Sequence, residues 1–252
     1  SVVKKLFLAL AINLMLIGCN KDAQELQFNE LSIEKVSEVN CNSEEENCTF
    51  VSLKTPIAEG DDERSKLVNS KITKHIIQLV DYQDQEKLAS LDELAQQFIR
   101  DYETTATEFP EYNIPWEAYV ESEITHDTEE LISIEFDLSL FTGGAHGHTS
   151  VTFLNFDPVT GKLLSSKDLF SEEFKGFVEK RFRMTNEIPE TESINSTGFY
   201  FENDTFQLPQ NIGFKKNKVI LRYNAYEIAS YADGNIQMEF TMEEIKPFAN
   251  FL

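Results

Sequence analysis

The stretch from Ile132 to Leu140 constrains the fold more than any other part of this sequence. Apolar and polar side chains alternate along it without a break, the apolar set being Ile132, Ile134, Phe136, Leu138 and Leu140 and the polar set Ser133, Glu135, Asp137 and Ser139. Because successive side chains of a β-strand point to opposite faces of a sheet, this pattern predicts a strand. One of its faces is buried, and the other meets solvent or a polar partner.

Three segments show the apolar spacing of helices that pack on such a sheet. The first, after GDDERS, carries Val68, Ile72, Ile76 and Val80. The second opens with Ser90 and Glu93 in the S-x-x-E capping pattern and carries Leu91, Leu94, Phe98 and Tyr102 on one face. The third is predicted over residues 168–187, with Phe170, Phe174, Phe177, Val178 and Phe182 inward.

The remaining strand patterns complete an α+β chain. They cover residues 29–40, 48–58, 116–124, 149–156, 199–208, 219–223 and 236–242, and residues 188–198 have the composition of a loop. The expected fold class is therefore α+β, with antiparallel sheet or sheets packed against about three helices. With 41% hydrophobic residues, the chain can bury one sizeable core or two small, closely packed halves.

The N-terminus has the pattern of an export signal. Lys4 and Lys5 precede an apolar run over residues 6–16, which is too short to cross about 30 Å of hydrocarbon. The run ends in Leu-Ile-Gly-Cys19, which resembles the lipobox of bacterial lipoproteins. The resemblance implies a signal peptide over residues 1–18, lipidation of Cys19, and a membrane-anchored protein of the bacterial cell envelope. Asn20, rather than Asp, favours the outer membrane. The alternative is an ordinary secretory signal with an incidental cysteine.

Export also bears on the other two cysteines and on the residues that follow Cys19. Cys41 and Cys48 bracket a six-residue polar loop between two strand patterns, and an oxidising compartment favours a disulfide that closes this hairpin. A zinc site would need two further ligands nearby. Residues 19–28 are polar enough to form a short tether between the lipid and the domain.

The charge of the mature chain limits its partners. Removal of residues 1–18 leaves 20 basic against 44 acidic residues, a formal net charge of −24. Such a surface repels nucleic acid and attracts basic partners. We therefore expect no nucleic-acid role, and the charge permits a basic protein as ligand.

Four separated motifs resemble an exported domain-of-unknown-function family, number 3298. They are TGGAHG from Thr142, NFDPVTGKLLSSKDLF from Asn155, FQLPQNIG from Phe206 and YNAYEIASYADG from Tyr223. The half before them is similar to the family's frequent partner, number 4163, which accompanies a peptidoglycan deacetylase. The resemblance implies a fold like the extracellular domain of RsiV-type anti-sigma factors, with halves over residues 29–145 and 146–252. Lysozyme and peptidoglycan are the ligands it implies.

The TGGAHGH segment holds the most conspicuous candidate site. His146 and His148 have strand spacing and would face the same side, as two metal ligands do, but the pattern lacks a third ligand. The segment also lacks the phosphate-loop pattern. A structural turn with Gly143 and Gly144, or a ligand-binding rim, fits it better. The candidate rim comprises Gly143, Gly144, His146, Tyr226 and Tyr231. Tyr223, Tyr226 and Tyr231 could stack on a sugar, but packing in the core is the use that we favour for them.

The sequence contains no catalytic motif, neither a G-x-S-x-G elbow nor H-E-x-x-H. We therefore expect no enzyme activity, no cofactor and no metal. The expected function is that of an envelope lipoprotein that binds a cationic protein, such as lysozyme, or a cell-wall glycan. The alternatives are a structural or accessory lipoprotein without a ligand, and a weak hydrolase of envelope polymer that would use paired carboxylates.

Overall fold

The computed structural model describes residues 24–252 except 46, 82–86 and 112, so the expected signal peptide and Cys19 lie outside the described residues. In chain order the elements are β1 (Phe28–Val36), β2 (Phe50–Ala58), α1 (Glu63–Val80), α2 (Leu91–Glu108), β3 (Glu117–Asp127), β4 (Ile132–Phe141), β5 (His148–Phe156), α3 (Ser166–Leu169), α4 (Glu173–Thr185), β6 (Asn211–Lys215), β7 (Lys218–Tyr223), β8 (Ile236–Thr241) and α5 (Met242–Ile245). The expected α+β class with three substantial helices is confirmed.

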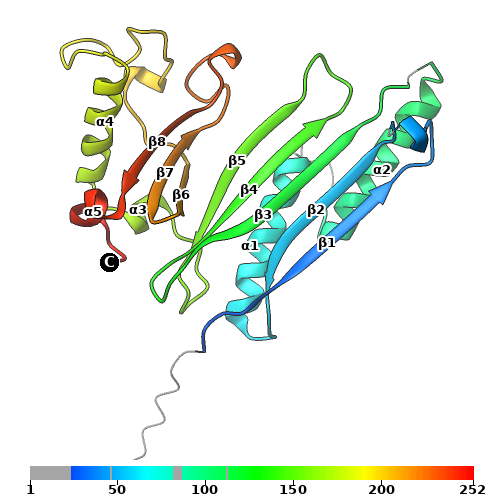
Figure 1. Cartoon of the computed structure of the whole chain (residues 1–252), viewed down its shortest axis with the longest axis horizontal. Helices are drawn as coiled ribbons and strands as arrows, with labels where there is room; N and C mark the ends of the chain where they lie inside the picture. Colours follow the sequence, from blue (N-terminus) through cyan, green and yellow to red (C-terminus); the bar gives the residue numbers. More distant parts are fainter. Residues whose placement is uncertain (1–23, 46, 82–86, 112) are drawn as a thin grey trace, which may run out of the picture.

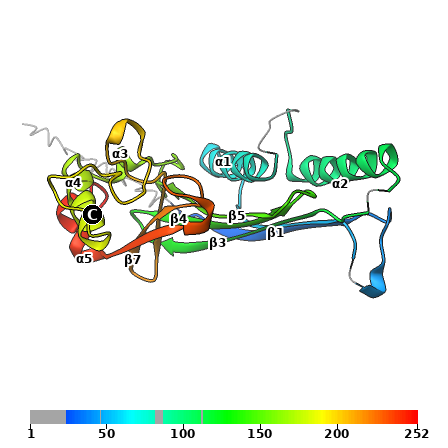
Figure 2. The ribbon, with the colours of Figure 1, turned by 90° about the horizontal axis from the view of Figure 1, so that it is seen from above.

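The larger sheet has the strand order β1-β2-β3-β4-β5, and α1 and α2 cover one of its faces (Figures 1 and 2). All its pairs are antiparallel except β2 with β3, which run parallel. The exception follows from the connection, because two helices lie between these strands and return the chain to the same end of the sheet. The other face of the sheet carries no helix (Figure 2).

The sequence patterns of the two long helices are confirmed by their burial. Val68, Ile72 and Ile76 of α1 are fully buried against the sheet. The Asp62 carboxylate caps α1 by accepting from the Ser65 amide at 2.8 Å, and the Ser90 hydroxyl caps α2 by accepting from the Glu93 amide at 3.1 Å. Capped ends and one apolar stripe explain why these segments form helices that lie flat on the strands.

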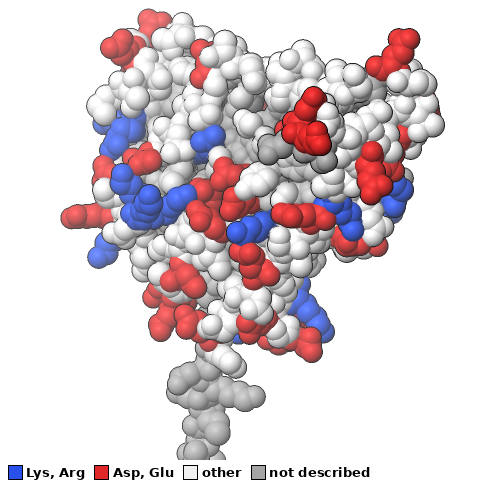
Figure 3. All heavy atoms as spheres, turned by 45° about the vertical axis from the view of Figure 1, so that its right-hand side comes forward, with Lys and Arg blue, Asp and Glu red and all other residues white. Residues whose placement is uncertain are grey.

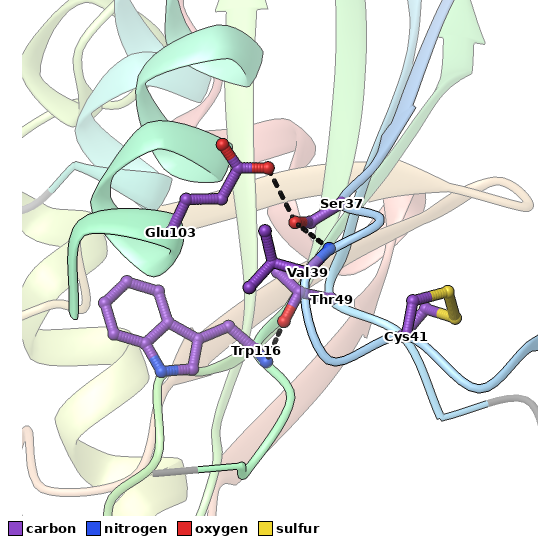
Figure 4. Close-up of a disulfide and its surroundings, with 7 residues drawn as sticks. Ser37, Val39, Cys41, Thr49, Glu103 and Trp116 are labelled. Atoms are coloured by element: carbon purple, nitrogen blue, oxygen red, sulfur yellow. Dashed lines mark hydrogen bonds between the residues drawn. A yellow bond between two sulfur atoms is a disulfide. The ribbon is translucent and has the colours of Figure 1, made fainter. Parts of the chain in front are cut away.

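The expected hairpin and its disulfide are present at the end of β1 and β2 (Figure 4). Cys41 is bonded to Cys48. At the base of the hairpin, the hydroxyl of Ser37 donates to the Glu103 carboxylate of α2 at 2.7 Å, and the Trp116 amide donates to the Thr49 hydroxyl at 2.8 Å. These bonds attach the base of the hairpin to α2 and β3.

A second, smaller unit follows the larger sheet. Its sheet has the order β6-β7-β8, and its core is rich in phenylalanine rings from α4 and the surrounding loops. The chain passes from one core to the other after Phe156, the last residue of the first core. The expected boundary between residues 145 and 146 lies instead inside the β4–β5 hairpin, where both strands belong to one sheet.

Two expected elements of the second unit are wrong. The helix expected over residues 168–187 is split, because Phe170 is extended and pairs with Ala249 of the C-terminal segment, and the main helix begins only at Glu173. Residues 199–208 do not form a strand. They contain a single 3-10 turn, while Phe201 and Phe206 reach the core from irregular backbone.

The end of the expected tether belongs to the folded domain. Leu26 is buried in the first core, the Gln27 carbonyl accepts from the Glu59 amide at 2.8 Å, and the Arg64 guanidinium donates to the Gln24 carbonyl at 2.6 Å. A tether over the full range of residues 19–28 is therefore wrong for its last five residues, which are fixed at the edge of the larger sheet.

Candidate functional site

The candidate rim is assembled at one end of the molecule. His146, from the β4–β5 loop, stacks on Tyr231 with 4.5 Å between ring centroids, and Tyr231 stacks on Tyr226 at 5.2 Å. These three rings are here called the ring stack. Tyr226 and Tyr231 are 53% and 47% exposed, so they do not pack in the core, whereas Tyr223 is buried. Gly143 has a φ of 84°, as expected of a glycine in the turn that presents His146.

A groove adjoins the ring stack at His146. It has a volume of about 460 Å³ and is lined by Gln78, Leu79, Leu138, Leu140, Thr142, Gly144, His146 and His148. His146 and His148 thus line the same space, as their spacing predicts. Its apolar part comes from α1 and β4, and its polar part from Gln78 of α1, the loop between β4 and β5, and His148 at the start of β5.

The other two histidines do not line this groove. His126, near the end of β3, pairs with Ser133, whereas His148 pairs with Leu140 at the far end of β4. His75 lies on α1, where its Nε2 is 2.7 Å from the hydroxyl of Thr152. Within the described ranges, no group of three His, Cys, Asp or Glu residues could hold a metal ion.

The second candidate surface is the face of the larger sheet that α1 and α2 leave uncovered. Its carboxylates come from alternate positions of three strands, β1, β3 and β4, and together they are here called the acidic face: Glu30, Glu34, Glu117, Glu121, Glu123, Glu135 and Asp137. The same alternation that buries the apolar side chains of β3 and β4 against the helices places these acids on the opposite side.

Like charges lie directly opposite each other on this face. Glu121 pairs in register with Asp137, and Glu123 pairs with Glu135. Lys215 relieves the second pair, since its Nζ lies 3.2 Å from Glu123 and 2.7 Å from Glu135. Lys54 contacts Glu121 only at 3.9 Å. The Glu121–Asp137 pair is therefore the less compensated of the two.

The environment of Asp137 reflects this crowding. Partial burial raises the pKa of Asp137, and the neighbouring Glu135 carboxylate raises this pKa further, while Lys215 and Arg222 lower it. The phenol of Tyr119, on the same face, donates to the Glu121 carboxylate. Figure 3 shows acidic side chains gathered across the middle of the molecule, with basic side chains beside them.

Two family models match successive parts of the chain. Residues 42–149 match the family described as "Deacetylase PdaC", and residues 167–243 match "Protein of unknown function (DUF3298)". The expected resemblance to family 3298 is thereby supported, as is that of the preceding half to a deacetylase-associated module. No curated protein matches the chain.

Solved structures share the fold over nearly the whole chain. A DUF3298 family member from Bacteroides fragilis is 18% identical with a TM-score of 0.67, covering 89% of this chain and 94% of that one. A DUF3298 family protein from Pseudomonas aeruginosa is 21% identical with a TM-score of 0.60, covering 90% and 96%. At such identities the similarity shows the fold alone. No helix among the described residues is long and apolar enough to cross a membrane.

Sequence reasoning missed the acidic face. Its signal was nevertheless present, because Glu117, Glu121 and Glu123 alternate with Ala118, Val120 and Ser122 in the strand pattern of β3. What the sequence lacked was the strand order, which sets these acids next to those of β4 and one strand away from those of β1.

Proposed function

We propose that this protein is a non-catalytic binding module of the bacterial cell envelope, which captures a basic protein on its acidic face. The single observation that carries the proposal is the exposed pair Glu121 and Asp137, held in register with weak compensation. Like charges directly opposite each other in a sheet destabilise it. A basic side chain placed between the two carboxylates would relieve that repulsion on binding.

The form of the surface supports the same function. Neither the helices nor the smaller sheet covers the part of this face around Glu121 and Asp137, and its acids are fixed by the pleat rather than carried on mobile loops. The net charge of the mature chain adds a long-range field that speeds encounter with a basic partner. The resemblance to the RsiV branch makes lysozyme, a strongly basic protein, the first probe to use.

We further propose that a lipid on Cys19 anchors the module to the envelope. Residues 24–27 enter at the end of the sheet where β1 begins, and the ring stack lies at the other end (Figure 1). Ten residues of β4 separate the two ends, about 30 Å. An anchored domain would therefore carry its ring stack away from the membrane, with the acidic face along its side.

Titration calorimetry with lysozyme tests the proposed partner. Binding should be measured at low salt and at about 0.15 M salt, where the Debye length is about 8 Å. The double variant Glu121→Gln/Asp137→Asn should bind roughly tenfold more weakly than the natural chain, which corresponds to about 1.4 kcal/mol. Asp61→Asn/Glu63→Gln removes the same charge near the start of α1 and is the matched control.

Three outcomes would contradict the proposal. They are the absence of heat at both salt concentrations, binding that disappears entirely at the higher salt, and equal weakening by the two double variants. The last two would reduce the interaction to nonspecific attraction between a negative and a positive molecule.

A further inference from the structure

We infer a second binding site, independent of the acidic face, in which the groove beside the ring stack takes a neutral pyranose sugar of a glycan chain. The groove of about 460 Å³ contains two kinds of surface. Leu79, Leu138 and Leu140 form its apolar part, and none of the described residues that line it is Asp, Glu, Lys or Arg. A ligand that fits it must carry apolar and hydrogen-bonding groups together and needs no charge.

The polar groups of the groove match sugar hydroxyls. Gln78 offers an amide and Thr142 a hydroxyl, and His146 and His148 each offer imidazole nitrogens. Each of these groups can donate or accept a hydrogen bond. The leucines face the C–H groups of a pyranose ring, or the methyl of an acetamido substituent, which are the parts of a sugar that gain from leaving water.

The ring stack extends this site along one side. Its rings lie nearly parallel, at 19° between His146 and Tyr231 and 28° between Tyr231 and Tyr226. Tyr226 and Tyr231 keep about half of their surface exposed, and a ligand that buries this surface gains free energy. Because His146 belongs both to the stack and to the groove, a sugar chain in the groove would continue onto the rings.

The loop that carries Tyr226 and Tyr231 is fixed before any ligand binds. Asn224, at the start of the β7–β8 loop, bonds to the backbone of β5, and the Tyr200 phenol donates to the Ala229 carbonyl of that loop. A site that is already ordered loses less conformational entropy on binding. A site ordered in this way is suited to a ligand that binds weakly, such as an oligosaccharide.

The four histidines provide a direct test, because two line the groove and two lie elsewhere. The imidazole proton resonances of the full chain should be followed by NMR during titration with chitotriose and, separately, with cellotriose. We expect the resonances of His146 and His148 to shift in a saturable manner with at least one of the two sugars. Those of His75 and His126 should stay in place.

Substitutions then test whether the bound sugar contacts the ring stack. Tyr231→Ala should weaken binding roughly fivefold by removing the middle ring of the stack. Tyr231→Phe, which keeps the ring, should restore it. Tyr119→Ala, which removes an exposed tyrosine from the acidic face, is the matched control. Thermal unfolding of each variant checks that it is folded, and Tyr231→Leu replaces Tyr231→Ala if the latter is not.

The proposal is overturned if neither sugar moves His146 or His148, if all four histidines shift together, or if loss of the Tyr231 ring leaves the affinity unchanged. Lysozyme binding on the acidic face is measured separately, so the failure of one proposal does not decide the other.

Discussion

The side-chain amide of Asn224 pairs with the backbone of Val151 as a neighbouring strand would. Its Oδ1 accepts from the Val151 amide at 3.0 Å, and its Nδ2 donates to the Val151 carbonyl at 2.9 Å. Val151 lies in β5, the edge strand of the larger sheet, and Asn224 directly follows β7 of the smaller one. One side chain therefore satisfies two edge groups and positions the loop that carries Tyr226 and Tyr231.

Asn224→Ala should lower the free energy of unfolding by about 2 kcal/mol, because two strand groups lose their partner at once. It should also shift the His146 resonance, since Tyr231 is no longer held beside it. Urea unfolding measures the first effect and NMR the second. Asn113→Ala, at an exposed loop position, is the control. A normal His146 resonance in Asn224→Ala would show that the loop is held by other contacts.

Gly213 forms another close contact between the two sheets. A Cβ at this position would overlap the ring of Phe153 in β5, so Gly213→Ala should destabilise the protein by about 2 kcal/mol through overpacking. Gly176 in α4 has no heavy atom within 4 Å of such a Cβ. Gly176→Ala should therefore leave the stability unchanged or raise it by up to about 1 kcal/mol. Equal urea midpoints for the two variants would contradict the close packing of Gly213 against Phe153.

These two contacts also show why the sequence predicts the first unit better than the second. The strands and helices of residues 28–156 follow regular spacings, as in β4 and α1, and their periodicity alone identifies them. In the second unit, Phe201 and Phe206 lie in the core on irregular backbone, so an apolar spacing there indicates burial and not a strand. The helix break at Phe170 depends on Ala249, distant in sequence.

The candidate sites, too, could be predicted from the sequence only in part. His146, Tyr226 and Tyr231 could be chosen from the sequence because they lie near glycines in two conspicuous motifs, but their exposure and their mutual stacking are visible only in the structure, where Asn224 holds the tyrosine loop to Val151. The acidic face depends on strand order, above all on the parallel pairing of β2 with β3 across two helices. Neither relation has a local sequence signal.

Reduction of the Cys41–Cys48 disulfide should lower the free energy of unfolding by about 2 to 3 kcal/mol. The bond closes a short loop, with a sequence separation of 7, and the chain-entropy model gives this magnitude for such a loop. Urea unfolding with and without reductant measures the difference, and Cys41→Ser/Cys48→Ser provides a form insensitive to reductant. Two cysteines that react with iodoacetamide in the native protein would contradict the pairing.

Asp137→Asn should stabilise the protein at neutral pH by about 0.5 kcal/mol while weakening its binding to a basic protein. The substitution removes the repulsion between Asp137 and Glu121 across β3 and β4. The natural pKa of Asp137 is raised by partial burial and by Glu135, so the advantage of the variant should shrink as the pH falls and the natural carboxylate takes up a proton. Asp61→Asn is the control. Loss of stability in Asp137→Asn would mean that the carboxylate has a structural role.

The final prediction concerns the pH dependence that His75 gives to the contact between α1 and the sheet. Its ring packs against Phe136 at 4.7 Å between centroids, and its Nε2 lies 2.7 Å from the Thr152 hydroxyl. Burial lowers the pKa of His75 from 6.5 to about 4. The folded protein thus keeps this ring neutral at pH values where the unfolded chain protonates it. Acidification from pH 6.5 to about 4 should therefore cost up to about 3 kcal/mol of stability.

Other groups oppose this loss, since the raised pKa values of Asp127, Asp137 and Glu227 favour the folded state as the pH falls. A comparison with His75→Gln isolates the histidine, because glutamine can still bond to Thr152 and carries no proton to gain. Urea unfolding of both proteins across pH 4 to 7 should show a difference that grows steadily on acidification below about 6.5. The same substitution at the exposed His148 is the control. Parallel curves for the natural chain and His75→Gln would mean that the ring is protonated equally in the folded and unfolded states.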